Sequence, residues 1–205
     1  MALIVPSMVL LPLLFALYNY NKLSKEYKIL AYYLVISLIG NISTSVLCLN
    51  NRNNLFISQL ITPIDLVCLC LFFRQTLIKT KLAITFIFVI LGFLIISLLS
   101  LMYVQSIEMY NNYTSTLEAF ILIFYAAANL FKILDHPEYY VRSRITELYI
   151  TSGILLYYSG SFIIFIIYNV ITFTSDLAFL IWNTHATFLL LMYILFAIGL
   201  WKYKK

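Results

Sequence analysis

Three ionisable side chains lie inside long apolar stretches of this sequence, where a charged group is costly. Asp65, Glu118 and His185 each fall within a segment of about 20 mostly apolar residues, the length that crosses a bilayer as a helix. A charged side chain at mid-helix in lipid costs about 2.5 to 3.5 kcal/mol on insertion scales, so such groups normally face the interior of a helix bundle. The sequence therefore predicts that these three side chains turn toward one another.

Other polar and aromatic side chains share the helix faces of these three residues. At about 100° per residue, side chains three, four or seven positions apart lie on one side of a helix. This spacing groups Thr62 with Asp65, and Trp182 with His185, with Asn183 adjacent. The same spacing gives a polar stripe that consists of Thr114, Glu118, Tyr125, Asn129 and Lys132. The predicted ligand-binding residues are Asn41, Thr62, Asp65, Glu118, Tyr158, Trp182, Asn183 and His185.

The depth of these groups predicts a shared cavity. Asp65 lies near the middle of its apolar segment, and Asn41, His185 and Glu118 lie about 4, 6 and 9 Å toward the outside at the rise of a helix. Four polar side chains at similar depth predict a polar cavity in the outer half of the bundle, closed toward the cytoplasm by aromatic and aliphatic residues. Protonation, or a cationic or hydroxylated ligand, would then change how the helices pack.

Each of these residues also has a structural interpretation. Asp65, Glu118 and His185 can form a buried hydrogen-bonded set that holds three helices in register. Asn41 is typical of the polar residues that hydrogen-bond neighbouring membrane helices, and Gly153 and Gly160 are typical of a face that a neighbouring helix approaches closely. The sequence leaves both interpretations open.

The composition is that of a membrane protein. Of the 205 residues, 63% are hydrophobic and 10% are charged, and the mean hydropathy is +0.98. An ordinary globular domain has about 25% charged residues, so a water-soluble fold is excluded. With 5 Gly, 4 Pro and 3 Cys, the chain is also neither collagen-like nor a disulfide scaffold.

Apolar segments separated by polar breaks predict the fold. We expect an all-α protein with a single domain over residues 1–205, built as one bundle of seven transmembrane helices. The predicted spans are residues 2–20, 28–49, 55–75, 82–104, 114–134, 147–171 and 178–200. The first and fourth spans have no polar stripe, which predicts that they form a lipid-facing wall.

The basic residues predict the orientation. All but one of the 13 Lys and Arg residues fall on one side of the predicted membrane, and only Arg52 falls on the other. Short loops rich in Lys and Arg stay cytoplasmic, so we expect the N-terminus outside and the C-terminus in the cytoplasm. The net charge of +5 then reflects topology and attraction to anionic lipid, and predicts no nucleic-acid partner.

Several kinds of chemistry lack the residues they need. A catalytic zinc site needs about three protein ligands, whereas the predicted spans offer one His and two candidate carboxylates, with no HExxH spacing. The seventh span has no Lys before Lys202, which excludes a retinal Schiff base. No Gly-rich phosphate loop or kinase signature is present. We therefore expect no metal, no cofactor and no enzymatic activity.

Four short motifs resemble those of a known set of proteins. They are Tyr113–Glu118 (YTSTLE), Leu156–Gly160 (LYYSG), Trp182–His185 (WNTH) and Phe196–Trp201 (FAIGLW). They resemble small uncharacterised multi-span proteins of Bacteroidota bacteria. The resemblance implies a bacterial inner-membrane location, signalling or defence neighbours, and recurrence of Glu118, Trp182 and His185 within shared motifs. Asp65 departs from the Glu expected at its position in that set.

Three classes of function remain compatible with these features. The first is a non-enzymatic sensing or signalling module, in which a small molecule, ion or proton enters the cavity and the basic inner loops present the change to a cytoplasmic or membrane protein partner. The second is a transporter or channel for a small solute or ion, with Tyr125, Asn129 and Lys132 as its inner lining. The third is an accessory, pore-forming subunit of a bacterial defence or signalling system, assembled through the face at Gly153 and Gly160.

Overall fold

The computed structural model describes residues 7–104, 106, 110–135, 142–167 and 175–203. Within these residues the secondary structure is entirely helical. The helices are α2 (Leu10–Tyr18), α3 (Lys25–Leu49), α4 (Leu55–Thr76), the 3-10 helix η1 (Lys81–Ile84), α5 (Thr85–Tyr103), α6 (Asn112–Asp135), α7 (Arg142–Ile167) and α8 (Ser175–Lys202).

Six helical segments are long and apolar enough to cross a membrane. They are Lys25–Leu49, Leu55–Thr76, Lys81–Tyr103, Asn112–Asp135, Arg144–Ile167 and Phe179–Lys202. Each has 22 to 25 residues, and a helix of that length spans a hydrocarbon core about 30 Å thick. These segments correspond to the second to seventh predicted spans and fit an all-helical integral membrane protein.

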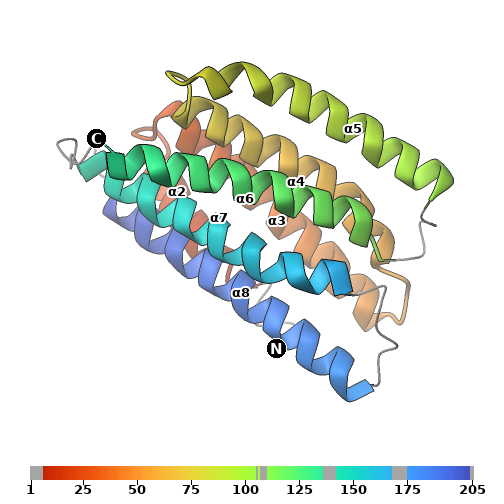
Figure 1. Ribbon diagram of the computed structural model, residues 1–205. Helices are drawn as coiled ribbons and strands as arrows, with labels where there is room; N and C mark the ends of the chain where they lie inside the picture. The colour runs from red at the N-terminus through yellow and green to blue at the C-terminus, as the bar shows by residue number, and fades with distance from the viewer. Residues whose placement is uncertain (1–6, 105, 107–109, 136–141, 168–174, 204–205) are drawn as a thin grey trace.

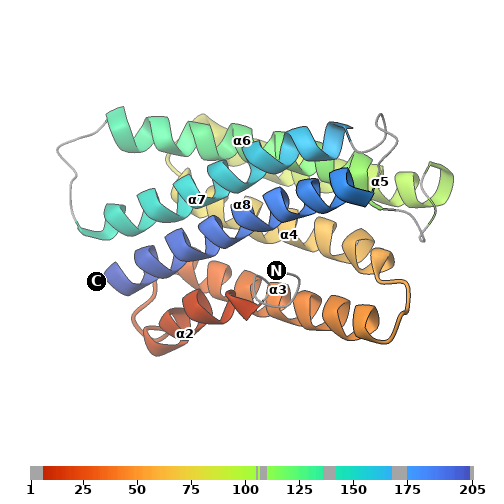
Figure 2. The same ribbon diagram turned by 90° about the horizontal axis from the view of Figure 1, so that it is seen from below.

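The structure does not show the first predicted span as a membrane-crossing helix. In place of a span over residues 2–20 it describes α2, a helix of nine residues, and residues 1–6 lie outside the described part. Nine residues rise about 14 Å, less than half of the hydrocarbon core. Figure 2 shows α2 beside α3, and α2 packs against both α8 and α3. Hydropathy alone could not predict this short helix, because its residues are as apolar as those of a membrane span.

The long helices lie side by side and alternate in direction (Figure 1). α7 packs between α6 and α8, and α4 packs between α3 and α6. The bundle thus has two ends. The basic end holds the start of α3 at Lys25, Arg74 in the last turn of α4, and Lys202 at the end of α8. The opposite end, which we call the Asn54 end, holds the turn between α3 and α4.

That turn depends on one backbone conformation. Asn51 has a positive φ of 52°, the left-handed region that Asn tolerates better than most residues. The Arg52 amide donates a hydrogen bond to the Leu47 carbonyl oxygen (2.9 Å), which closes the end of α3. α4 therefore begins next to α3 and returns along it, so their polar faces meet.

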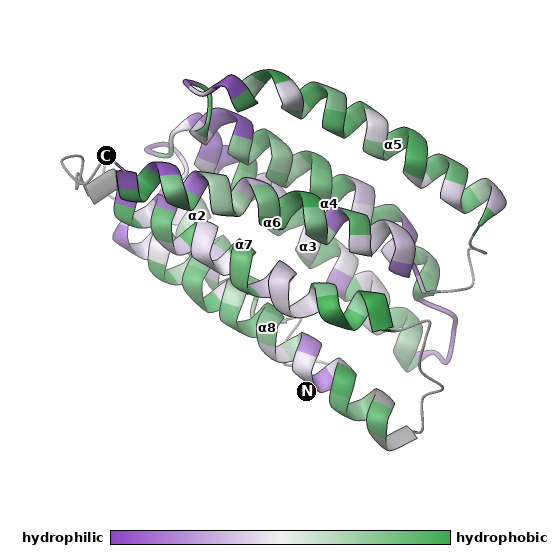
Figure 3. Cartoon of the chain, in the orientation of Figure 1, coloured by the Kyte–Doolittle hydropathy of each residue, from purple (hydrophilic) through white to green (hydrophobic). Residues whose placement is uncertain are grey.

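α5 is the most peripheral of the spanning helices. It lies along one edge of the bundle, against α4 and α6, and is coloured hydrophobic over most of its length (Figure 3). Phe86 and Phe93 are buried, but large side chains such as Phe88, Leu91 and Ile95 are exposed. An apolar surface of this kind suits contact with lipid, as expected for the fourth predicted span.

Candidate functional site

A cavity of about 450 Å³ lies inside the half of the bundle at the Asn54 end. Residues of α3, α4, α6, α7 and α8 line it, together with Asn54 and Tyr110 from the connections at that end. Its deepest lining residues include Tyr33, Asp65 and Tyr193, which lie well within their helices. The cavity is thus built from side chains of five helices.

Seven of the eight predicted site residues line this cavity. They are Asn41, Thr62, Asp65, Glu118, Tyr158, Trp182 and His185. The structure therefore places Asp65, Glu118 and His185 in the wall of one cavity. Asn183 is not among the described lining residues. It follows Trp182 by one residue, or about 100° around α8, and so lies on a different face of that helix.

Glu118 is buried on α6 and hydrogen-bonded to α7. Its side chain is 5% exposed, and the Tyr158 hydroxyl donates a hydrogen bond of 3.1 Å to its Oε1. Tyr158 is itself 2% exposed. A carboxyl group that is removed from bulk water needs a donor, and this bond supplies one. The pair links α6 to α7 at the cavity wall.

Asp65 on α4 has an oxygen without a partner. Its Oδ1 is buried and has no hydrogen-bond partner among the residues that the structure describes. Asp65 as a whole is half-buried and lines the cavity, so its carboxyl group is a part of the wall with unused hydrogen-bonding capacity.

His185 on α8 is held by two hydroxyl groups of α7. Its Nδ1 lies 3.0 Å from the Ser161 hydroxyl, and its Nε2 lies 3.5 Å from the Tyr157 hydroxyl. Trp182 packs edge-on against the imidazole, with 5.8 Å between ring centroids. Both ring nitrogens therefore have polar neighbours within the chain. The imidazole is fixed by α7, and this supports a positioning role for His185 in the cavity wall.

Two further contacts join helices across the cavity. Asn41 on α3 donates a hydrogen bond of 3.5 Å to the Tyr193 hydroxyl on α8. Thr62 on α4 lies 3.4 Å from Ser115 on α6, hydroxyl to hydroxyl. Such bonds between membrane helices contribute about 0.6 to 2 kcal/mol each, so Asn41 and Thr62 serve helix packing as well as the lining.

Several lining residues were not among the predicted site residues. Helical spacing in the sequence could have identified some of them. Tyr193 follows His185 by eight positions, with Leu189 midway, so the three lie on one face of α8. Ser58 precedes Asp65 by seven positions and shares its face of α4. The other missed residues include Tyr33, Ser37, Tyr110, Ser115, Tyr157 and Phe165.

The bundle is closely packed between the cavity and the basic end. Leu66, Phe72, Phe73, Leu122 and Phe196 are all fully buried. The Phe196 ring lies beneath this cavity against the ring of Tyr33, with 6.4 Å between centroids. The described residues thus form an apolar floor between the cavity and the basic end.

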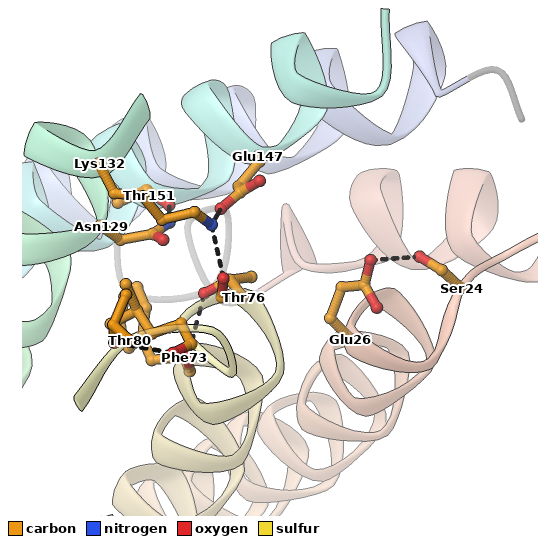
Figure 4. A network of polar contacts seen from close by, with 10 residues as sticks. Ser24, Glu26, Phe73, Thr76, Thr80, Asn129, Lys132, Glu147 and Thr151 are labelled. Atoms are coloured by element: carbon orange, nitrogen blue, oxygen red, sulfur yellow. Dashed lines mark hydrogen bonds and ion pairs between the residues drawn. The ribbon is translucent and has the colours of Figure 1, made fainter. Parts of the chain in front are cut away.

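The polar stripe on α6 continues below this floor, but its members are engaged with different neighbours (Figure 4). Asn129 donates to the Thr151 hydroxyl (2.9 Å), and the Lys132 ammonium lies 3.3 Å from Glu147 Oε1 and also donates to the Thr76 carbonyl. These contacts tie α6 to α7 and α4. The stripe therefore holds the basic end together and forms no continuous lining.

The site carries no grouping that would hold a metal. Among the described residues, no three His, Cys, Asp or Glu side chains lie close enough together to ligate an ion. Cys68 and Cys70 lie two residues apart on α4, which turns them to different faces. The arrangement can bind a molecule through its carboxyl, hydroxyl and aromatic groups.

No family model, curated protein or solved structure matches this chain. The functional argument therefore depends on the geometry of the cavity and on the charge distribution along the chain.

Proposed function

We propose that this protein is a non-enzymatic sensing module that binds a small molecule in the cavity and transmits the binding event through the bundle. The observation that carries the proposal is the composition of the cavity wall. The cavity combines Asp65, Glu118 and His185 from α4, α6 and α8 with a packed apolar floor. A ligand that contacts three helices at once favours one arrangement of those helices over others.

The charge distribution suggests the direction of signalling. Lys and Arg gather at the basic end, which supports a cytoplasmic location for that end and an external location for the cavity mouth. The basic connections would then present the change to a cytoplasmic or membrane protein partner. The resemblance to Bacteroidota membrane proteins supports the bacterial inner membrane as the location.

Transport is a weaker candidate in this geometry. A transporter or channel needs a route past Phe72, Phe73 and Phe196, all of which are fully buried in the floor. The stripe that would line such a route is engaged in helix contacts. The accessory-subunit hypothesis loses its proposed interface, since α8 of the same chain covers Gly153 and Gly160.

A ligand panel tests the proposal. The purified protein in nanodiscs is screened by thermal unfolding against water-soluble amines, amino acids, carboxylates, sugars and nucleosides. We expect at least one compound to raise the unfolding temperature, and Glu118→Gln to abolish that rise. Glu26→Gln is the matched control at the basic end, where the Ser24 hydroxyl donates a hydrogen bond to Glu26.

The same compounds are then tested for uptake into liposomes that contain the protein. Stabilisation without uptake supports sensing. Uptake that depends on Glu118 would replace sensing with transport. A panel in which no compound stabilises the protein would remove the proposal.

A further inference from the structure

The cavity wall has two acidic side chains and, among its described residues, no Lys or Arg. The acidic side chains are Asp65 and Glu118. Tyr158 donates to Glu118, whereas Asp65 Oδ1 has no hydrogen-bond partner among the described residues. A buried carboxyl is costly unless a counter-charge or donor accompanies it. A ligand that brings a positive charge and N–H donors would supply what Asp65 lacks.

Aromatic rings form much of the remaining wall. Tyr33, Tyr157 and Tyr193 line the deeper part, and Trp182 and Tyr110 stand edge to face near the mouth with 5.1 Å between their centroids. Aromatic faces attract cations, and more strongly where water is excluded. They also pack well against carbon chains and rings. Both properties favour an organic cation.

Inorganic cations fit this wall poorly. Calcium takes about six to eight oxygen ligands, and magnesium needs near-octahedral oxygen coordination. The described residues offer no cluster of three His, Cys, Asp or Glu side chains. The volume of about 450 Å³ instead falls in the range of pockets that hold small organic ligands.

We propose that the cavity binds a protonated organic amine, with the ammonium group hydrogen-bonded to Asp65 and the carbon skeleton packed against the tyrosine and tryptophan rings. This inference rests on the proposed function, because it names the class of ligand that the sensing module receives. Glu118 forms the α6 side of the site and keeps its hydrogen bond with Tyr158.

Matched ligands of equal size test the charge requirement on the wild-type protein. Isothermal titration calorimetry in nanodiscs compares phenethylamine with 2-phenylethanol and phenylacetate, and butylamine with butanol and butyrate. We expect each amine to bind at least about tenfold more tightly than its neutral partner, since a charge-assisted hydrogen bond is lost in the alcohol. The carboxylates should not bind. If no amine binds more tightly than its alcohol, the inference is overturned.

A conservative variant tests the role of Asp65. Asp65→Asn keeps the size of the side chain and removes its charge, and we expect it to weaken amine binding about tenfold. Asp135→Asn makes the same change at an exposed position at the end of α6 and should leave the affinity unchanged. Equal amine affinity in Asp65→Asn and the wild type would overturn the assignment. If Asp65→Asn does not fold, the comparison of matched ligands on the wild-type protein still decides whether the cavity binds amines.

The two proposals fail differently. If a carboxylate, sugar or nucleoside stabilises the protein and Glu118→Gln abolishes the effect, sensing stands and the amine inference is wrong. If no compound of any class stabilises the protein, both are wrong.

Discussion

At the scale of single residues, the bond between Tyr158 and Glu118 is the contact on which the cavity wall most depends. Both side chains are at least about nine-tenths buried, at 2% and 5% exposed, and they join α6 to α7. Removing one partner of a buried hydrogen bond costs more than the bond contributes, because the remaining group has lost its hydration without compensation.

Tyr158→Phe removes only the hydroxyl group. We expect a loss of about 1 to 3 kcal/mol in the free energy of unfolding, since Glu118 would lose its donor. Thermal or denaturant unfolding in detergent measures the loss. Tyr113→Phe is the control, because Tyr113 is 56% exposed on α6. Equal stability of the two variants would contradict the importance of the Tyr158 hydroxyl.

The sequence allowed the acids and the histidine of the site to be predicted because lipid penalises charge wherever it occurs. That penalty acts on Asp65, Glu118 and His185 irrespective of which helices become neighbours. The partners of His185 were not predictable in this way. Ser161 and Tyr157 are reached only when α7 lies against α8 in one particular register, and a single sequence does not specify that register.

At the scale of helices, close packing of α7 on α8 depends on glycine. A Cβ at Gly153 would lie 3.2 Å from the Phe196 ring and 3.3 Å from the Met192 carbonyl oxygen. At Gly160 it would lie 2.5 Å from the Phe188 ring. Small residues let membrane helices approach closely, and spacing alone predicted this face. What spacing could not show is that the partner is α8 of the same chain.

Gly153→Ala should separate α7 from α8. We expect a loss of about 1 to 3 kcal/mol in stability, as for other overpacked positions. Gly92→Ala on α5 is the matched control, because nothing lies within 4 Å of its Cβ position. Gly92→Ala should stabilise the protein by up to about 1 kcal/mol, since Ala favours a helix over Gly. Changes of opposite sign in the free energy of unfolding of the two variants would support close packing at Gly153. An unchanged stability of Gly153→Ala would refute it.

At the basic end, polar contacts of Lys132 join three helices. The Lys132 ammonium on α6 contacts Glu147 on α7 and the Thr76 carbonyl at the end of α4. We expect Lys132→Met to cost about 1 to 3 kcal/mol, because two charge-assisted contacts are lost. Lys81→Met, at an exposed position of η1, should have little effect.

A double variant distinguishes the interaction between Lys132 and Glu147 from the separate effects of the two residues. Lys132→Met combined with Glu147→Met leaves no unpaired charge and should be less destabilised than the sum of the single variants. Strictly additive losses in unfolding free energy would show that Lys132 and Glu147 do not act together.

At the scale of the whole molecule, the cavity and the polar contacts between helices lie at opposite ends of the bundle. The Asn54 end contains the cavity, and the basic end contains the cross-links between α4, α6 and α7. The apolar floor lies between them, so a ligand acts on the basic end only through the helices themselves. This arrangement requires the cavity mouth and the basic connections to lie on opposite sides of the membrane.

Labelling of introduced cysteines tests that requirement. In a Cys48→Ser background, which removes the exposed native thiol, Asn53→Cys and Lys79→Cys place thiols at the Asn54 end and the basic end, respectively. A membrane-impermeant maleimide on intact cells should label Asn53→Cys, and should label Lys79→Cys only after permeabilisation, because Lys- and Arg-rich loops remain cytoplasmic.

The reverse pattern would place the cavity mouth in the cytoplasm. The ligand would then come from inside the cell, and the basic connections could not carry its signal to a cytoplasmic partner. Labelling of both positions on intact cells would mean that the two ends are not separated by the bilayer, which would contradict the six-span assignment itself. Because the cavity, floor and basic end follow one another along the same helices, the side on which Asn53→Cys reacts determines the side from which the ligand arrives.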